Sequence, residues 1–249
     1  MHTEVYTETL PELDIEAPAR QRRWTVLLRL LLLIPQFIVL YVLNIVTFFA
    51  AIGAWFAALV LGRLPEWAAS YLSAYVAYVT RVYASLLLLI DRYPPFAFEA
   101  PGFPVQVELR PGELNRLAVF FRIILVIPAA IVAGLATSGW FVLSFFCWLV
   151  VLIMGRNPEP LAGATAAILR YSMRLHAYFL MLTSAYPKRL FGDTGSAEQV
   201  SWTHPLRLET AGKVLLGVFI VAGLAYPIVP PVTVGSSSNT HISPGIQAP

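Results

Sequence analysis

The stretch that decides the fold is an apolar run at residues 24–61, which reads WTVLLRLLLLIPQFIVLYVLNIVTFFAAIGAWFAALVL. Arg29 is its only charged residue. As one straight helix these 38 residues would be about 57 Å long, whereas the hydrocarbon core of a bilayer is about 30 Å thick. We therefore expect two helices joined by a turn near Asn44 and Thr47, that is, a helical hairpin.

The composition extends this membrane interpretation to the whole chain. Its 249 residues are 58% hydrophobic and only 12% charged, whereas a soluble domain carries about 25% charged residues. The amino terminus is acidic and polar and lacks the basic start and apolar core of a secretory signal, so we expect no cleaved segment. These features predict an integral membrane protein and exclude an ordinary soluble domain.

The chain contains an internal repeat at a constant offset of 93 residues. The segment from Arg23 to Pro94 aligns with 116–187 without a gap, and Gly, Pro, Trp and Arg residues coincide. We predict repeat 1 at 23–99 and repeat 2 at 100–192. The predicted elements are a hairpin at 24–61 and a second helix at 65–92 in repeat 1, and a hairpin at 117–154 and a second helix at 158–185 in repeat 2.

The second helix of each repeat has an amphipathic pattern. At 100° per residue its polar residues form one narrow stripe, next to a band of aromatic residues. This stripe includes Glu66 and Arg81 in repeat 1, and Glu159, Arg170 and Arg174 in repeat 2. The pattern is typical of a helix lying at the membrane interface with its charges toward water.

Short alternating segments precede the apolar helices. They lie at 13–16 within an N-terminal segment 1–22, at 105–108, and at 206–209 within a linker 193–212. Period-two alternation predicts strands, which we expect to pair into a small cytoplasmic sheet. A last transmembrane helix is predicted at 213–229, followed by an uncharged, disordered tail at 230–249 outside the cell.

Charge predicts the topology. If both hairpins point the same way and the amphipathic helices lie flat, all 17 Lys and Arg residues fall on one side of the membrane. The positive-inside rule places that side, and the amino terminus, in the cytoplasm. We expect a multi-pass protein of a bacterial-type plasma membrane with five crossings. Two alternatives are seven crossings, with Arg81 and Arg174 near mid-bilayer at a cost of about 2.5–3.5 kcal/mol each, and hairpins that enter one leaflet only.

The predicted fold class is thus all-α integral membrane, with two tandem repeats of a hairpin plus an interfacial helix, one further transmembrane helix and a small sheet. The sharpest repeated motif is Gly-Arg-x-Pro-Glu. In one interpretation Arg63, Glu66, Arg156 and Glu159 form a pseudo-symmetric polar site for a lipid phosphate or a partner's carboxylate. In the other, glycine ends one helix, proline and glutamate start the next, and arginine reaches the headgroups.

Further arginines are candidates for contacts with lipid phosphate. Arg81, Arg170 and Arg174 would face anionic headgroups from the amphipathic helices. Arg29 and Arg122, about one turn inside their apolar runs, would also extend toward the headgroups, or pair with an acid.

The sequence contains no catalytic, cofactor or metal motif. Cys147 is the only cysteine, and the four histidines have no ligand spacing. The net charge of +3 is not arranged as a basic patch with interleaved aromatic residues, which disfavours nucleic acid. We expect no cofactor, no metal and no enzymatic activity, and anionic lipids with a protein partner on the cytoplasmic face as the partners.

The Arg-containing hairpin with Ile-Pro, the Gly-Arg-x-Pro-Glu junction, the aromatic amphipathic helix and the closing Tyr-Pro at 93–94 and 186–187 together resemble bacterial membrane proteins of the domain of unknown function 4389 family. The resemblance covers residues 23–190 and implies a membrane protein without an assigned activity. We expect a scaffold, assembly or membrane-organising protein. The alternative is a lipid-handling or small-solute transport protein that uses the cleft between the repeats.

Overall fold

The computed structural model describes residues 10–16, 20–193 and 201–225. Repeat 1 and the segment before it form β1 (Glu12–Ile15), α1 (Arg23–Leu27), α2 (Arg29–Leu61) and α3 (Glu66–Leu86). Repeat 2 forms β2 (Val105–Glu108), α4 (Arg116–Phe120), α5 (Arg122–Val142), α6 (Ser144–Met154) and α7 (Glu159–Phe179). The last described helix is α8 (Thr210–Ala225). The chain is thus mostly helical, with two tandem repeats.

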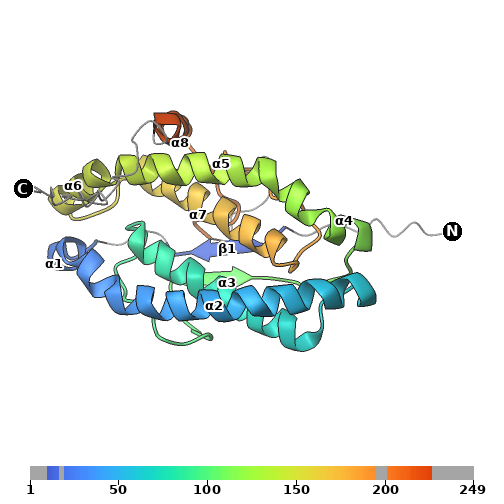
Figure 1. The fold of residues 1–249 in the computed structure, drawn as a ribbon. Helices are drawn as coiled ribbons and strands as arrows, with labels where there is room; N and C mark the ends of the chain where they lie inside the picture. The colour runs from blue at the N-terminus through green and yellow to red at the C-terminus, as the bar shows by residue number, and fades with distance from the viewer. Residues whose placement is uncertain (1–9, 17–19, 194–200, 226–249) are drawn as a thin grey trace, which may run out of the picture.

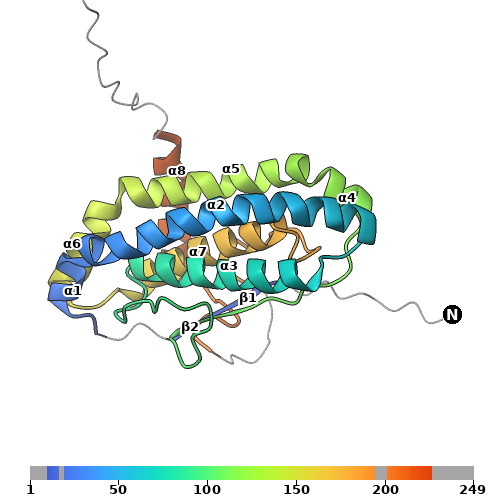
Figure 2. The same cartoon turned by 60° about the horizontal axis from the view of Figure 1, so that its bottom comes forward.

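The repeats are arranged about a pseudo-two-fold axis in three layers (Figures 1 and 2). The outer layer holds α2 and the α5–α6 pair, which run in opposite directions, with α1 and α6 at one end of the molecule and α4 at the other. The middle layer holds α3 and α7, and the third holds the two strands. Although α2 and α5 run antiparallel, both repeats present their outer helix to the same side of the molecule.

Reciprocal backbone hydrogen bonds connect the two repeats. The backbone N–H of Gln21 donates to the carbonyl of Gly155 at 2.9 Å, and the N–H of Leu114 donates to the carbonyl of Gly62 at 2.8 Å. Both donors lie just before the short first helix of one repeat, α1 or α4, and both acceptors end an outer-layer helix of the other, α6 or α2. The two contacts are related by the same 93-residue offset, so the duplication persists in the tertiary structure.

The expected hairpins at 24–61 and 117–154 were wrong. Helix α2 continues for 33 residues through Asn44 and Thr47, and α6 follows α5 to the same end of the molecule after a local irregularity at Leu143, without turning back (Figure 1). Asn44 accepts a hydrogen bond from the Tyr75 hydroxyl at 2.5 Å, so a polar residue that is also common in turns contacts α3 instead. The length argument excludes a straight helix only along the membrane normal.

Both crossing counts therefore change. Five and seven crossings each assumed two arms in every hairpin, and those arms do not exist. Among the helices of the described residues, α2 and α5 are long and apolar enough to cross a membrane. Fewer helices are able to cross than we expected, because a pair of hairpin arms is replaced by a continuous helix. In repeat 1, for example, one helix of about 50 Å takes the place of both arms.

The helix boundaries follow the local signals in the sequence. Gly62 and Gly155 end α2 and α6 in the left-handed conformation, with φ of 71° and 64°. A side chain with a Cβ rarely adopts that conformation, which is why glycine stands there. Pro65 and Pro158 cap the next helices, each followed by an acid in the first turn. This part of the Gly-Arg-x-Pro-Glu interpretation is confirmed.

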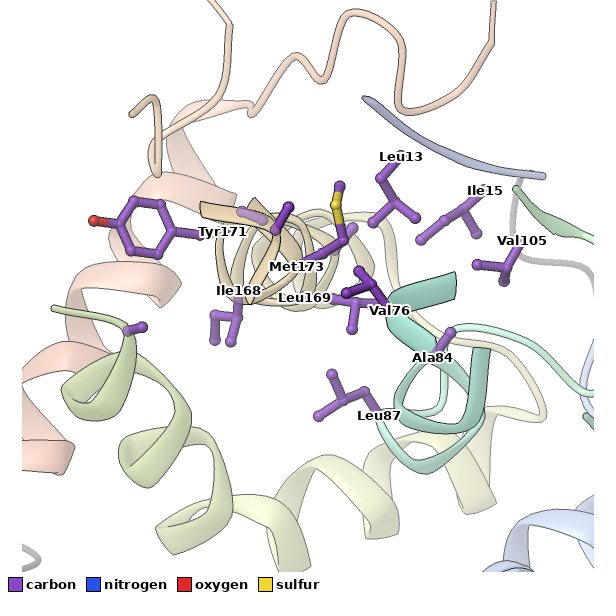
Figure 3. Packing of buried hydrophobic residues seen from close by; sticks show 14 of the residues in the cluster. Leu13, Ile15, Val76, Ala84, Leu87, Val105, Ile168, Leu169, Tyr171 and Met173 are labelled. Atoms are coloured by element: carbon purple, nitrogen blue, oxygen red, sulfur yellow. The ribbon is translucent and has the colours of Figure 1, made fainter. Parts of the chain in front are cut away.

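The expected interfacial helices at 65–92 and 158–185 are core helices. Most of α7 is buried, and α3 packs between α2 and the sheet. In Figure 3, Leu169 and Met173 of α7, Val76 of α3, and Leu13 and Val105 of the strands surround one apolar core. The part of the polar stripe that holds Arg81, Arg170 and Arg174 faces inward, where loops supply carbonyl groups. Glu66 and Glu159, at the starts of the two helices, are exposed. The amphipathic pattern is therefore present, but its arginines meet protein rather than water.

The small sheet has two strands rather than three. β1 and β2 pair antiparallel, with Glu12 opposite Glu108 and 15 opposite 105. The segment 206–209 is not a strand. Instead, the Thr203 hydroxyl accepts from the N–H of Ile15 at 2.8 Å and donates to the carbonyl of Leu13 at 2.9 Å. One side chain from the linker therefore satisfies the edge of β1 that a third strand would have covered.

Helix α8 crosses α5 at a steep angle, end-on in Figure 1 and upright in Figure 2. The backbones touch at Gly139 and Gly223: a Cβ at Gly139 would lie 1.6 Å from the carbonyl oxygen of Phe219. The helix predicted at 213–229 is described from 210 to 225. Residues 226–229 and the predicted tail 230–249 lie outside the described residues.

Candidate functional site

The outer layer presents a large apolar surface along its whole length. Leu30, Phe49 and Val60 of α2 are 68%, 67% and 72% exposed, and Ile124 of α5 and Ile153 of α6 are 62% and 64% exposed. Exposed apolar patches beyond a few hundred Å² mark membrane or partner surfaces. Together with the length of α2 and α5, this surface supports membrane association.

Exposed acids lie in the opposite layer. Asp14 and Glu108 of the strands, and Glu16 just after β1, are all exposed. The order from one side of the molecule to the other is thus apolar helices, core helices and charged sheet (Figure 2). A layered polarity of this kind matches a molecule with one face in lipid and the other in water.

An apolar groove lies between the repeats. It has a volume of about 310 Å³ and is lined by α3 of repeat 1 and by α5 and α7 of repeat 2. Apolar lining residues include Val79, Leu87, Ala133, Ile168 and Met173. Pockets of this size that are mostly apolar are typical of small-molecule sites.

The polar groups of the groove are few. They are Thr80, Thr137, Ser172 and His176, with Tyr83 at the pseudo-symmetric position of His176. His176 is exposed and its Nδ1 contacts the carbonyl of Ser172 at 2.8 Å. Hydroxyl and imidazole groups along an apolar groove can orient an amphiphilic molecule without binding a charged group.

The lining of the groove includes residues of α5 but none of the equivalent helix α2, and the two repeats differ there in residue size. Its α5 wall carries four small residues: Ala130, Ala133, Gly134 and Thr137. The equivalent residues of α2 are Phe37, Leu40, Tyr41 and Asn44. The smaller side chains of α5 leave more space beside α3 and α7. This difference in size is visible when the two repeats are aligned, and it is the signal in the sequence that could have predicted the groove.

Two of the predicted headgroup contacts bind loop carbonyls instead. Arg81 donates to the carbonyls of 97 and 98 at 2.8 and 2.7 Å, and Arg174 donates to those of Pro11 and Lys188 at 3.0 and 3.2 Å. Their residue exposures are 4% and 5%. Burial lowers the pKa of Arg174 to about 10, and neighbouring Arg170 acts in the same direction.

Arg170 is buried in an ion pair with Asp193 at 2.5 Å and donates to the carbonyl of Arg189 at 3.1 Å. Burial alone would raise the pKa of Asp193, but Arg170 and the N–H of Leu206 together lower it. The expectation that Arg81, Arg170 and Arg174 face lipid was therefore wrong. Each arginine donates hydrogen bonds to a loop and so connects it to the middle layer. The buried carbonyl groups of the loops need such donors.

The four junction residues do not form one site. Arg63 and Glu66 are exposed at the α4 end of the molecule, whereas Arg156 and Glu159 are exposed at the α6 end (Figure 1). Arg63 forms an isolated antiparallel bridge with Glu113. The antiparallel repeats separate the two motifs by the length of α2. Lipid contact by each motif alone stays a prediction.

Arg29 and Arg122 also differ from our expectation of headgroup contact. They are 5% and 3% exposed. Arg29 forms an ion pair with Asp91 at 3.2 Å, which matches the alternative that it pairs with an acid. Arg122 donates to the carbonyl of Thr183 at 2.9 Å and lies over the ring of Tyr178 at 4.2 Å.

Metal ligands are not gathered in the described ranges: no group of three or more His, Cys, Asp or Glu residues lies together there. Cys147 is buried. The remaining candidates for a functional site are therefore the groove and the arginines near the ends of the long helices.

Comparison with known proteins gives one match. The family model described as "Domain of unknown function (DUF4389)" matches residues 23–97 and again residues 116–190. These are the two repeats, at the offset seen in the structure. No match was found among curated proteins or among solved structures.

Proposed function

Because the chain belongs to the family Domain of unknown function (DUF4389), which carries no assigned activity, we propose its function from the geometry. We infer a non-enzymatic membrane protein that binds an apolar chain of a membrane lipid in the groove between α3, α5 and α7. The single observation that carries this proposal is the groove of about 310 Å³, because it lies between the repeats and beside the exposed apolar layer. This lipid-handling role takes precedence over the scaffold role that the sequence alone favours.

The chemistry of the lining fits a hydrocarbon chain. Most of the lining is apolar, and its polar members are neutral hydroxyls and one histidine. A small charged solute would lose its hydration there without gaining an opposite charge. An acyl or isoprenoid chain loses no hydrogen bonds and adds dispersion contacts.

In the orientation that we propose for the protein in the membrane, α2 and α5 lie flat in one leaflet. If they crossed the bilayer, the sheet beside their midpoints would place Asp14 and Glu108 at mid-membrane depth (Figure 1). Exposed carboxylates are costly there. With the pseudo-two-fold axis along the membrane normal, the apolar layer enters the lipid, and the sheet remains in water.

Helix α8 supports the same disposition. It runs at a steep angle to α5, so it would lie close to the membrane normal when α5 lies flat (Figure 2). Its start lies near the middle layer, where Gly212 approaches Pro160, and its later residues pass α5 at Gly139. The arginines at both ends of α2 would then share one depth, which favours the cytoplasmic leaflet by the positive-inside rule.

The groove is tested with a phosphatidylglycerol whose acyl chain carries a photoreactive diazirine. We expect crosslinks to α3, α5 and α7 peptides in reconstituted protein. Gly134→Leu should abolish these crosslinks, because a side chain at Gly134 meets open space and would fill the groove. Gly217→Leu is the matched control, since Gly217 of α8 also faces open space. Equal crosslinking of both variants would refute the proposal that the groove binds a lipid chain.

The disposition is tested separately with spin labels at Leu30, Ile45 and Val60, three exposed positions along α2. A flat helix gives one depth at all three. A crossing helix gives mid-bilayer depth at Ile45 and interfacial depth at the other two, which would overturn the flat arrangement.

A further inference from the structure

The buried arginines at the starts of α2 and α5 differ in what neutralises them. Arg29 donates from Nη1 to the carbonyls of Ser85, at 2.8 Å, and Ile90. Its Nη2 donates to the carboxylate of Asp91 at 3.2 Å and contacts Gln21 Oε1 at 3.4 Å. One terminal nitrogen therefore binds the backbone, and the other binds an acid.

Arg122 keeps the backbone contact and lacks the acid. Its Nη2 donates to the carbonyl of Thr183, which is the equivalent of Ile90. Its Nη1 and Nε are buried and have no hydrogen-bond partner among the described residues. Each arginine thus has one terminal nitrogen on a backbone carbonyl, but the second terminal nitrogen has an acid in repeat 1 and no partner in repeat 2.

The sequence explains the difference position by position. Asp91 corresponds to Ser184, and Gln21 corresponds to Leu114. Thr25, which also donates to the Asp91 carboxylate, corresponds to Ala118. All three polar groups around the guanidinium are therefore lost or shortened in repeat 2, while the arginine is kept.

Tyr178 does not replace the missing acid. Its ring lies 4.2 Å from the guanidinium carbon of Arg122 and stabilises the face of the cation. The N–H groups of a guanidinium lie in its plane, and Tyr178, even where its hydroxyl helps to hold the cation, brings no carboxylate to them. Buried N–H groups without an acceptor are costly, and a phosphate oxygen is a suitable acceptor.

We propose that Arg122 binds a phosphate group in the position that Asp91 occupies beside Arg29. Ser184 is exposed, and the Asp91 side chain is 24% exposed at the equivalent place, so the position is reached from outside. Leu117 and Phe121, which lie shortly before Arg122 in the chain, are 66% and 43% exposed. A lipid lying against these residues brings its headgroup phosphate to Arg122. Inorganic phosphate has the same chemistry.

The test uses the full chain, delipidated in dodecyl maltoside, and follows the thermal unfolding midpoint. One series adds inorganic phosphate at constant ionic strength, a second adds dioctanoylphosphatidylglycerol, and a third adds uncharged dioctanoylglycerol. The variants are Arg122→Gln and Ser184→Asp, with Ser70→Asp as an exposed control. Ser184→Asp restores the acid of repeat 1 and should occupy the site from within.

We expect the phosphate-bearing additives to raise the midpoint of the unmodified protein and of Ser70→Asp. Both Arg122→Gln and Ser184→Asp should need at least about tenfold more ligand for the same rise. A response to inorganic phosphate identifies a site for phosphate alone, and a response to the lipid only identifies a headgroup site; either supports the proposal.

An unmodified protein without any phosphate response, or a response that Ser184→Asp leaves unchanged, overturns the proposal. If Arg122→Gln does not fold, Ser184→Asp still decides. The site is separate from the groove, so loss of diazirine crosslinking at α3, α5 and α7 with an intact phosphate response would refute only the groove.

Discussion

The indole of Trp148 donates to the backbone carbonyl of Val26 at 2.9 Å, across 122 positions of the chain. Its repeat equivalent, Trp55, donates to the carbonyl of Val119 at 3.1 Å. Trp55 belongs to α2 and Trp148 to α6, and each contacts the short first helix of the other repeat. These exchanged contacts make each repeat depend on its partner.

Trp148→Phe should therefore lower the free energy of unfolding by about 1 kcal/mol, the usual net value of one hydrogen bond. Trp55→Phe should have a similar effect, and the double variant should be additive because the contacts lie at opposite ends. Chemical denaturation in mild detergent measures this. Trp24→Phe is the control, since Trp24 is 75% exposed, and an equal loss there would contradict the reciprocal contact.

Gly139→Ala should separate α8 from α5. The added Cβ would lie 1.6 Å from the Phe219 oxygen, and the contact is with backbone rather than with a movable side chain. We expect a loss of several kcal/mol, on the order of an overpacked core, measured as a lower unfolding midpoint and faster proteolysis. Gly217→Ala faces open space and should instead raise stability, by up to about 1 kcal/mol.

Acid should weaken the loop that Arg170 fastens. The pKa of Asp193 is lowered in the folded protein, so its contribution to stability is present above the unfolded pKa and is lost as the pH falls through the folded pKa. We expect the unfolding midpoint to fall as the pH is lowered below about 4. Asp193→Asn should be less stable at neutral pH and show a smaller acid dependence; an unchanged dependence would argue against this pair.

Thr203→Val should destabilise the sheet, because it removes the hydroxyl that bridges Ile15 and Leu13 while keeping the shape of the side chain. Two backbone groups at the edge of β1 then lose their partner, at about 1–3 kcal/mol. Hydrogen exchange at the amide of Ile15 reports the change directly. Ser70→Ala, at an exposed position, should leave that amide protected.

Local signals in the sequence were enough to predict the repeat, the helix ends and the first two strands. Gly62 and Pro65 act through the conformations of their own backbone, and the alternation at 105–108 acts through neighbours along the strand. These effects need no knowledge of the rest of the chain. The resemblance to the family was confirmed for the same reason, since it rests on such motifs.

The environment of each helix was decided only by the tertiary structure. A polar stripe containing Arg81 and Arg174 satisfies its hydrogen bonds equally well with water, headgroups or the carbonyls of a distant loop, and the sequence alone does not distinguish these acceptors. Length likewise excluded a straight α2 only for one orientation to the membrane. The antiparallel repeats then separated Arg63 from Arg156, because packing between the repeats depends on contacts between residues far apart in the chain, such as Gln21 with Gly155.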